Sequence, residues 1–426
     1  MDYHYLENKI SIMKRLLLLC FILISAYIKA QDCTDAYTTD IYTDVTIETV
    51  KFGEAVNSDG ENQELMMDIY IGDGNVAEDR PLIILAFGGA FIAGERTSGD
   101  MVYFATEFAK KGYVCASIDY RITDAFSLLA EENLVKTVVN AVHDGKAAIR
   151  YFRKDAATTN TYKIDTAAVF IGGTSAGGIL SVHLAYLDDY EKLPANWRPY
   201  VDDLPNALEG ESGNPGYCSV PNGVFAFAGA IADTSWFENN DVPLYNIHST
   251  HDQTVAYESG KPLNGLAPIT LYGGFSMHER MTNIGVHSVF DSYIGDEHPP
   301  FNGTDDTENA RRLQVTEDNL ALFLNNIIHC NPNNLLAENV QTCANSSVTV
   351  EENALSEYLV YPNPSEGIFN IKNAEKFSNY SVDNQLGQTI LSGYSASSID
   401  ATELESGIYI LKLNGNQSAT IRLMIE

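Results

Sequence analysis

The segment Gly173-Thr174-Ser175-Ala176-Gly177 places one serine among small residues, between the apolar run AVFI and the run ILSVHLAYL. Small neighbours allow a sharp strand-to-helix turn in which the serine occupies a strained conformation with its hydroxyl exposed. The N-terminus of the following helix favours negative charge developing beside it. The pattern G-x-S-x-G in this setting predicts that Ser175 is a nucleophile for acyl transfer. The alternative interpretation is a glycine-rich turn whose serine has no catalytic role.

A serine hydroxyl needs a base to take its proton, and the base needs a carboxylate to orient it. Asp252 follows the predicted strand VPLYNIHS, where ligand chemistry collects in parallel sheets, and is the predicted acid. His298 in GDEHPPF follows the last predicted strand and is the preferred base. His287 is the alternative base, although its place inside that strand favours a half-buried packing role. His248 and His251, beside the acid, are interpreted as loop histidines.

The segment FGGAF directly follows the buried run PLIILA. Acyl transfer requires donors for the charge that develops on the carbonyl oxygen. The backbone N–H groups of Gly88, Gly89 and Ala90, together with that of Ala176, are predicted to form this oxyanion hole. An ordinary glycine turn is the alternative.

Between residues 40 and 330 the sequence alternates apolar runs typical of strands with amphipathic runs typical of helices. This alternation predicts an α/β fold around a mainly parallel sheet. The first two runs, VTIETVKFG and ELMMDIYIG, are predicted to pair antiparallel. The further predicted strands are PLIILAF, YVCASIDYR, TAAVFIGG, GVFAFAGAI, VPLYNIHS and VHSVFDSYIG, and the predicted helices are MVYFATEFAKKG, residues 131–153, ILSVHLAYL and TEDNLALFLNNII.

Residues 188–222 interrupt this alternation and are rich in Pro, Gly, Asn and acidic residues. A loop of this length without structure is uncommon in a compact domain, so we expect a cap or a substrate-facing insertion. Its aromatic residues Trp197, Tyr200 and Tyr217 are expected to shape the acyl or alcohol pocket.

The N-terminus has the pattern of a secretory signal. Lys14 and Arg15 precede the apolar residues 16–28, which predicts a signal peptide over residues 1–30, with Met13 as an alternative start. The apolar run is too short to cross a bilayer core of about 30 Å, so no stable membrane insertion is expected.

The rest of the chain divides into three parts. Residues 31–330 form the predicted catalytic domain. Residues 331–355 are Asn-rich and acidic without periodicity, which indicates a linker. Residues 356–426 contain short alternating runs separated by Gly, Asn and Ser, which predicts a small all-β sandwich. Carbohydrate binding is one interpretation of that sandwich, although no tryptophan follows Trp236.

The formal net charge of -31 argues against nucleic acid or an anionic membrane surface as a partner. A strong negative charge is typical of secreted proteins, which it helps to keep soluble. Of the 6 cysteines, Cys20 lies in the predicted signal, which leaves an odd number. Cys115, inside GYVCASIDY, is predicted to be a buried thiol, and Cys330 with Cys343 is the candidate disulfide. No C-x-x-C spacing occurs, so neither a metal nor another cofactor is indicated.

Residues 40–330 resemble the α/β-hydrolase-fold carboxylesterases of the hormone-sensitive-lipase and carboxylesterase type, with GGAF matching the oxyanion loop and GTSAGG the nucleophile elbow. The resemblance implies Ser175 as nucleophile, Asp252 as acid and His298 as base. The sequence differs from the family in having Phe87 where the loop usually has histidine, and Thr174 where an acidic residue usually precedes the serine.

The tail resembles a second family. YPNPSEGIFNI, VDNQLGQTI and IDATELESGIYILKL are similar to the C-terminal sorting domain of type IX secretion in Bacteroidetes. This resemblance covers residues 356–426 and implies export across the outer membrane, with the secretion machinery as a partner.

Together these patterns predict a secreted serine hydrolase that cleaves carboxylic esters of small molecules or polysaccharides. A serine peptidase using the same residues and a catalytically silent surface binding protein on a hydrolase scaffold are the alternatives.

Overall fold

The computed structural model describes residues 37–328, 359–361, 365, 367–372, 374–384, 389–404, 407–415 and 419–425. The chain divides into two units, Met1–Asn345 and Ser346–Glu426. The predicted signal peptide 1–30, the linker 331–355 and the candidate Cys330–Cys343 pair lie outside the described residues.

The first unit is built on an eight-stranded sheet with the order β1-β2-β4-β3-β5-β6-β8-β11. β1 pairs antiparallel with β2, and β2 antiparallel with β4, whereas all later neighbours are parallel. The mainly parallel α/β-hydrolase sheet expected from the sequence is therefore confirmed. Its strands are β1 (Val45–Val56), β2 (Asn62–Gly72), β3 (Arg80–Ala86), β4 (Val114–Ile118), β5 (Ile164–Thr174), β6 (Gly223–Phe227), β8 (Leu244–Ser249) and β11 (Ser288–Tyr293).

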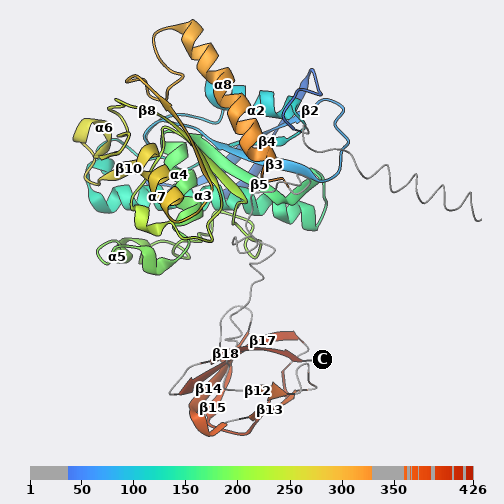
Figure 1. Cartoon of the computed structure of the whole chain (residues 1–426). Helices are drawn as coiled ribbons and strands as arrows, with labels where there is room; N and C mark the ends of the chain where they lie inside the picture. The colour runs from blue at the N-terminus through green and yellow to red at the C-terminus, as the bar shows by residue number, and fades with distance from the viewer. Residues whose placement is uncertain are drawn as a thin grey trace, which may run out of the picture. The chain divides into compact units, whose positions relative to one another are not determined.

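Helices cover both faces of this sheet (Figure 1). α3 and α4 pack against each other and against β5, while α2 packs against β2, β3 and β4 and also contacts α8. α7 packs against β8 and β11. The helices are α2 (Gly99–Lys110), α3 (Glu131–Ala157), α4 (Ala176–Tyr186), α5 (Arg198–Asp202), α6 (Pro262–Gly265), α7 (Gly274–Asn283) and α8 (Asp306–Asn325), with 3-10 turns η1 (Ser127–Leu129), η2 (Tyr190–Lys192) and η3 (Thr234–Trp236).

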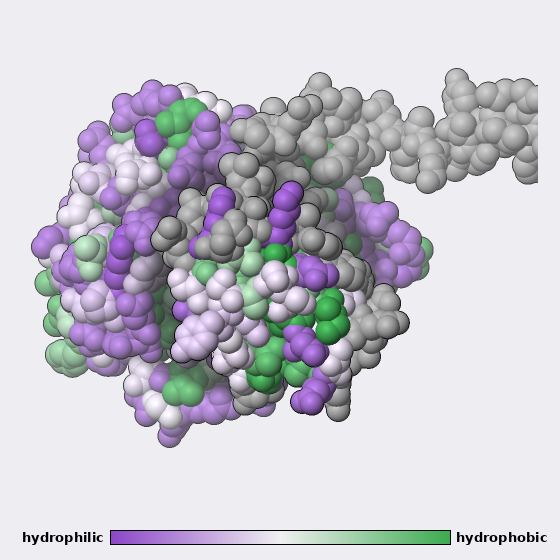
Figure 2. Space-filling view, turned by 90° about the horizontal axis from the view of Figure 1, so that it is seen from below, coloured by the Kyte–Doolittle hydropathy of each residue, from purple (hydrophilic) through white to green (hydrophobic). Residues whose placement is uncertain are grey.

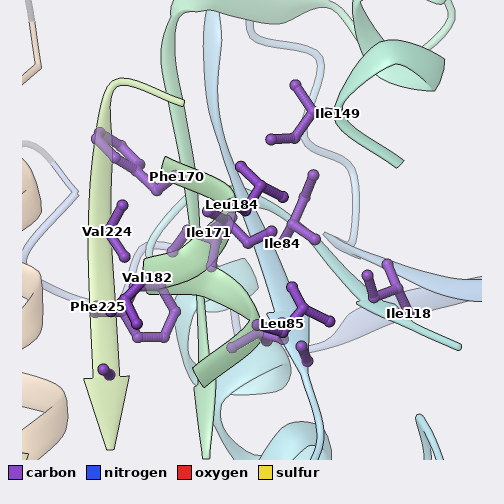
Figure 3. Packing of buried hydrophobic residues seen from close by; sticks show 14 of the residues in the cluster. Ile84, Leu85, Ile118, Ile149, Phe170, Ile171, Val182, Leu184, Val224 and Phe225 are labelled. Carbon is purple, nitrogen blue, oxygen red and sulfur yellow. The ribbon is translucent and has the colours of Figure 1, made fainter. Parts of the chain in front are cut away.

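The core lies between the central strands and these helices. All seven residues of β3 and all five of β6 are buried, as their continuous apolar runs require. Figure 3 shows side chains of these strands, such as Ile84 and Phe225, beside Val182 and Leu184 of α4. Nearly every residue of α4 is buried, because both the sheet and α3 cover it.

One predicted strand is wrong. GVFAFAGAI is not a single strand, because the chain turns at Ala228, whose φ is 53°. Its first half is β6 of the large sheet. Its second half is β7 (Ala230–Ile231), which joins β10 (Leu271–Gly273) and β9 (Ser259–Gly260) in a small antiparallel sheet. The turn brings Gly229 against Gly178 of α4, where an added Cβ would meet the Gly178 backbone at 2.9 Å.

The second unit is a sandwich of two sheets, β12-β13-β16 and β15-β14-β17-β18, around one apolar cluster that includes Phe369, Val382 and Leu411. This confirms the small all-β fold expected for the tail. Its elements are β12 (Leu359–Tyr361), β13 (Ile368–Lys372), η4 (Ala374–Lys376), β14 (Phe377–Asp383), β15 (Thr389–Tyr394), β16 (Ser398–Asp400), β17 (Gly407–Gly415) and β18 (Ala419–Ile425).

Figure 2 shows a face covered largely by hydrophilic residues, with smaller apolar patches between them. Among the helices that the structure describes, none combines the length and apolarity that a membrane crossing needs. Cys115 is a buried free thiol, as expected, and Cys218 takes part in a disulfide.

Candidate active site

Ser175 occupies the turn between β5 and α4. Its φ of 52° and ψ of -113° place it in a strained region of backbone space, and its own N–H donates to Phe227 O of β6 at 2.8 Å. The residue is 8% exposed. The turn thus holds the hydroxyl above the carboxyl end of the sheet while the backbone stays anchored to a neighbouring strand.

The glycines on either side of this turn are required by close packing. A Cβ on Gly173 or on Gly177 would lie 1.9 Å from Ala86 O at the end of β3. Any larger residue at either position would push the turn away from β3. The small residues that the sequence pattern singled out therefore seat the turn against the sheet.

His298 and Asp252 come together with this serine. His298 Nε2 lies 2.7 Å from Ser175 Oγ, and His298 Nδ1 lies 2.6 Å from Asp252 Oδ2. His298 follows β11, Asp252 follows β8 and Ser175 follows β5. The carboxyl ends of these strands meet at the same edge of the sheet. In this arrangement Nδ1–H donates to the carboxylate, and Nε2 accepts from the serine hydroxyl.

Asp252 is 5% exposed, and both of its oxygens accept hydrogen bonds. Oδ1 accepts from the N–H groups of Thr254 at 2.8 Å and Val255 at 3.0 Å. Burial alone raises the pKa of Asp252, but hydrogen bonds from His248 and His298 outweigh it and hold that pKa well below its ordinary value. The Asp252 carboxylate therefore stays ionised in the folded protein.

The interpretation of His248 as a loop histidine is wrong. It belongs to β8, is fully buried, and its Nε2 lies 3.3 Å from Asp252 Oδ2 and 2.9 Å from Val255 O. Its Nδ1 accepts from the N–H of Gly274 at 3.1 Å, which leaves the proton on Nε2. Sequence reasoning missed this contact because β8 ends between the two residues, and the turn after it folds Asp252 back. The only signal of this contact in the sequence was the spacing of four residues between His248 and Asp252.

Helix α8 holds the loop that carries His298. Arg312 of α8 donates to Pro300 O at 2.7 Å and pairs with Glu297 at 3.1 Å. His287 lies elsewhere, with its ring stacked on Phe323 of α8 at a centroid distance of 6.0 Å. Burial lowers the pKa of His287. Of the two candidate bases, only His298 contacts the serine.

The FGGAF loop lies beside the serine. The backbone of Gly88 packs on Ser175, since an added Cβ would be 3.4 Å from Ser175 Cβ. Gly89 and Ala90 have φ values of 134° and 53°, so the chain reverses here. Within residues 37–328, no group accepts a hydrogen bond from the N–H groups of Gly89, Ala90 or Ala176. Together with the N–H of Gly88, these are the donors expected from the sequence to form an oxyanion hole.

Phe87 and Thr174, the two residues that differ from the family pattern, each make a contact that fixes the local backbone. Phe87 stacks on buried Tyr120, and the Tyr120 hydroxyl donates to Phe87 O at 2.8 Å. Burial raises the pKa of this hydroxyl, so it remains a donor. Thr174 Oγ1 donates to Asp100 Oδ2 of α2 at 2.6 Å, which links the serine turn to the start of that helix.

Two concavities meet at the serine and share Ala90, Ser175 and Thr254. The first, here called the apolar cavity, has a volume of about 220 Å³ and includes Val138, Ile179, Trp197 and Trp236 in its lining. The second, here called the second concavity, has a volume of about 680 Å³ and is lined by polar and apolar residues together, among them Asp100, His298, Phe301 and Leu313.

The insertion 188–222 reaches the apolar cavity only through its first part. Trp197 lines the cavity as expected, whereas Tyr200 and Tyr217 do not. The later part of the insertion packs on α3, where Arg150 binds Glu209 and the main chain of Gly213. Basic residues of α3 therefore hold this part of the insertion on α3. In the described residues, no group of three or more His, Cys, Asp or Glu side chains is arranged to hold a metal ion.

Comparison with known families and structures agrees with this architecture. Residues 67–207 match the family model BD-FAE, an esterase-like α/β hydrolase domain. Residues 359–426 match the model described as the secretion system C-terminal sorting domain. No curated protein matched the sequence.

Solved structures similar to the chain include forms of esterase 2 from Thermogutta terrifontis. The form phosphonylated by cyclosarin is 20% identical, with 65% of this chain and 94% of that chain covered and a TM-score of 0.47. The propionate-bound form is 21% identical over the same shares, with a TM-score of 0.46.

The sheet topology and the two family matches lead to one assignment. The chain combines an esterase-like α/β-hydrolase domain with a type IX secretion sorting domain, which marks it as a secreted or cell-surface protein.

Proposed function

We propose that this protein is a serine hydrolase that cleaves carboxylic esters through an acyl-Ser175 intermediate after export. The observation that carries the proposal is the continuous series of contacts from Ser175 Oγ through His298 to Asp252, at 2.7 and 2.6 Å. This series ends beside a loop of free N–H donors and between two concavities.

In the first half-reaction, Ser175 Oγ forms a bond to the ester carbonyl carbon as His298 Nε2 takes its proton. The negative charge on the carbonyl oxygen is stabilised by the N–H groups of Gly89, Ala90 and Ala176. His298 then gives the proton to the alcohol oxygen as the carbon–oxygen bond breaks. Asp252 holds His298 in the required tautomer and balances its transient charge.

In the second half-reaction, water replaces the alcohol. His298 takes a proton from the water as its oxygen attacks the acyl carbon, and then returns a proton to Ser175 Oγ, which releases the acid. The substrates are esters of small molecules or esters attached to polysaccharides that an exported enzyme meets.

The test is covalent labelling of the purified protein by a fluorophosphonate probe, combined with burst kinetics on an activated ester. We expect one labelled site, at Ser175, and a burst close to one equivalent per chain. Ser175→Ala should abolish both and lower turnover by at least about a thousandfold. Ser181→Ala is the matched control, because Ser181 lies on α4 and donates to Gly177 O rather than facing the site.

Two outcomes would reject the proposal. Folded protein that is neither labelled nor active on any ester indicates a silent binding scaffold. Faster cleavage of peptide anilides than of esters by the same Ser175 indicates a peptidase.

A further inference from the structure

His298 lies in a loop, residues 294–305, that joins β11 to α8 and contains no helix or strand. In the proposed reaction its Nε2 first takes a proton from Ser175 and then gives a proton to the leaving alcohol. An imidazole on an irregular loop meets both oxygens only if contacts from outside the loop fix its place. The contacts that fix this loop therefore bear directly on catalysis.

Arg312, in the second turn of α8, contacts the loop on both sides of His298. Its Nη1 donates to Pro300 O at 2.7 Å and lies 3.1 Å from Glu297 Oε1. Glu297 directly precedes His298, and Pro300 follows it by two residues. A single nitrogen of the guanidinium therefore bridges the carboxylate before the histidine and the main chain after it.

The guanidinium is itself held from two other sides. Its Nε donates to Glu308 Oε1, one turn earlier on α8, at 2.8 Å. Its central carbon lies 5.3 Å from the centre of the Tyr293 ring, at the end of β11. Arg312 is 8% exposed, and these partners leave its planar fork little freedom to turn. The loop is thus held against a fixed group.

We propose that Arg312 is a positioning residue for the base, which keeps His298 Nε2 directed at Ser175 and at the oxygen of the leaving alcohol. This role rests on the proposed serine hydrolase function and adds a residue to that same site. It is carried by the two contacts of Arg312 that flank His298.

Glu297 shows that the contact is kept at a cost in stability. Its Oε2 is buried and has no hydrogen-bond partner among the described residues. The side chain fills the space beside two glycines: an added Cβ on Gly295 would overlap Glu297 Oε2, and one on Gly303 would lie 2.9 Å from Glu297 Cγ. Burying a half-paired carboxylate lowers the stability of a fold. A purely structural role does not explain such a group, whereas fixing Arg312 beside the base does.

The two ends of the loop are fastened by other contacts. At one end the N–H of His251, just after β8, donates to Gly295 O at 2.8 Å. At the other end Asn309 of α8 exchanges two hydrogen bonds of 2.8 Å with the main chain of Gly303. Removing the Arg312 guanidinium is therefore expected to free only the stretch between these ends.

The experiment compares kcat/KM of the purified protein for ethyl butyrate and p-nitrophenyl butyrate. Both esters need His298 as a base, but only the ethyl ester needs it as an acid, because p-nitrophenolate leaves without a proton at neutral pH. For Arg312→Met we expect a loss of roughly a hundredfold on the ethyl ester and roughly tenfold on the p-nitrophenyl ester. A variant that only unfolds in part would lose equally on both, since only the concentration of folded enzyme changes.

Further variants separate the role of the contact from that of the charge. Glu297→Gln keeps an oxygen for Nη1 and should leave the ratio of the two esters close to that of the wild type, whereas Glu297→Leu should change it as Arg312→Met does. Arg311→Met is the matched control, because Arg311 pairs with the same Glu308 but its side chain is 58% exposed. If Arg312→Met does not fold, Arg312→Lys takes its place. Lysine keeps the charge but lacks the planar fork, so the ratio should shift in the same direction.

Each result decides the question. Equal losses on the two esters for Arg312→Met, or a similar change of ratio for Arg311→Met, would overturn the positioning role. Fluorophosphonate labelling of Ser175 in the same wild-type sample would show that the hydrolase itself stands. Folded wild-type protein that is not labelled and cleaves neither ester would overturn the hydrolase and the role of Arg312 together.

Discussion

The hydroxyl of Tyr120 donates a 2.8 Å hydrogen bond to the main-chain oxygen of Phe87, and the two rings stack with centroids 4.1 Å apart. Phe87 immediately precedes Gly88, Gly89 and Ala90. The sequence resemblance to carboxylesterases led us to expect a histidine at this position of the loop. The contact with Tyr120 holds the loop that we expect to form the oxyanion hole.

Tyr120→Phe keeps the stacked ring but leaves Phe87 O without its donor. We expect a loss of about 1–3 kcal/mol in the free energy of unfolding and a decrease of about tenfold in kcat with little change in KM. Urea denaturation and ester kinetics measure the two effects. Tyr186→Phe is the matched control, since this buried hydroxyl donates to Val242 O at 3.1 Å, away from the serine. Equal kcat values for the two variants would contradict a role in the loop.

His248→Phe removes the buried N–H beside Asp252 and is expected to lower kcat by about tenfold, because hydrogen bonds to charged groups contribute about 1.5–3 kcal/mol. His248→Gln keeps a donor and should recover most of the activity. The rate of fluorophosphonate labelling, measured from pH 5 to 9, should shift for the Phe variant and not for the Gln variant. His278→Phe on α7 is the control, and a Phe variant with an unchanged profile would leave His248 a purely structural residue.

Asp241 is expected to make the free energy of unfolding depend on pH. Burial, above all, raises the pKa of its carboxyl to about 7, while Lys192 opposes the shift. In the unfolded chain the group ionises near pH 4, so between about pH 4 and 7 the folded state binds more protons and stability falls as pH rises. Asp241→Asn should remove this loss, which amounts to roughly 4 kcal/mol at pH 8.

Urea unfolding at pH 5 and pH 8 checks this expectation. The wild type should lose more stability between the two values than Asp241→Asn does. Asp59→Asn, at an exposed turn, serves as the control and should follow the wild type. Parallel pH slopes for wild type and Asp241→Asn would show that Asp241 is ionised in the folded protein throughout this range.

Asp144 forms a buried ion pair with Arg121, at 2.8 Å between Oδ1 and Nη2, and also accepts from Ser212 at 2.6 Å. Asp144→Asn leaves the buried guanidinium uncompensated, and we expect a loss of about 3–5 kcal/mol in the free energy of unfolding. Glu132→Gln, which breaks an exposed pair with Lys136, should cost less than about 1 kcal/mol. Chemical denaturation of both variants provides the comparison, and similar losses would contradict it.

The order of strands and helices could be predicted from the sequence because hydrophobic periodicity is a local property. The turn at Ser175 was equally accessible, since its glycines meet a requirement of the backbone within a few residues. The same reasoning failed at GVFAFAGAI, where Ala228 adopts a left-handed conformation that no local signal marks.

The sequence already favoured His298 over His287 as the base, from its place after the last predicted strand. Other side-chain partners were beyond local reasoning, because the contact of His248 with Asp252 and that of Tyr120 with Phe87 depend on how distant segments pack. So does the meeting of two concavities at Ser175, to which several separate segments contribute. Sequence patterns report what each segment prefers along the chain, whereas contacts between segments follow from the packing of the whole sheet and its helices.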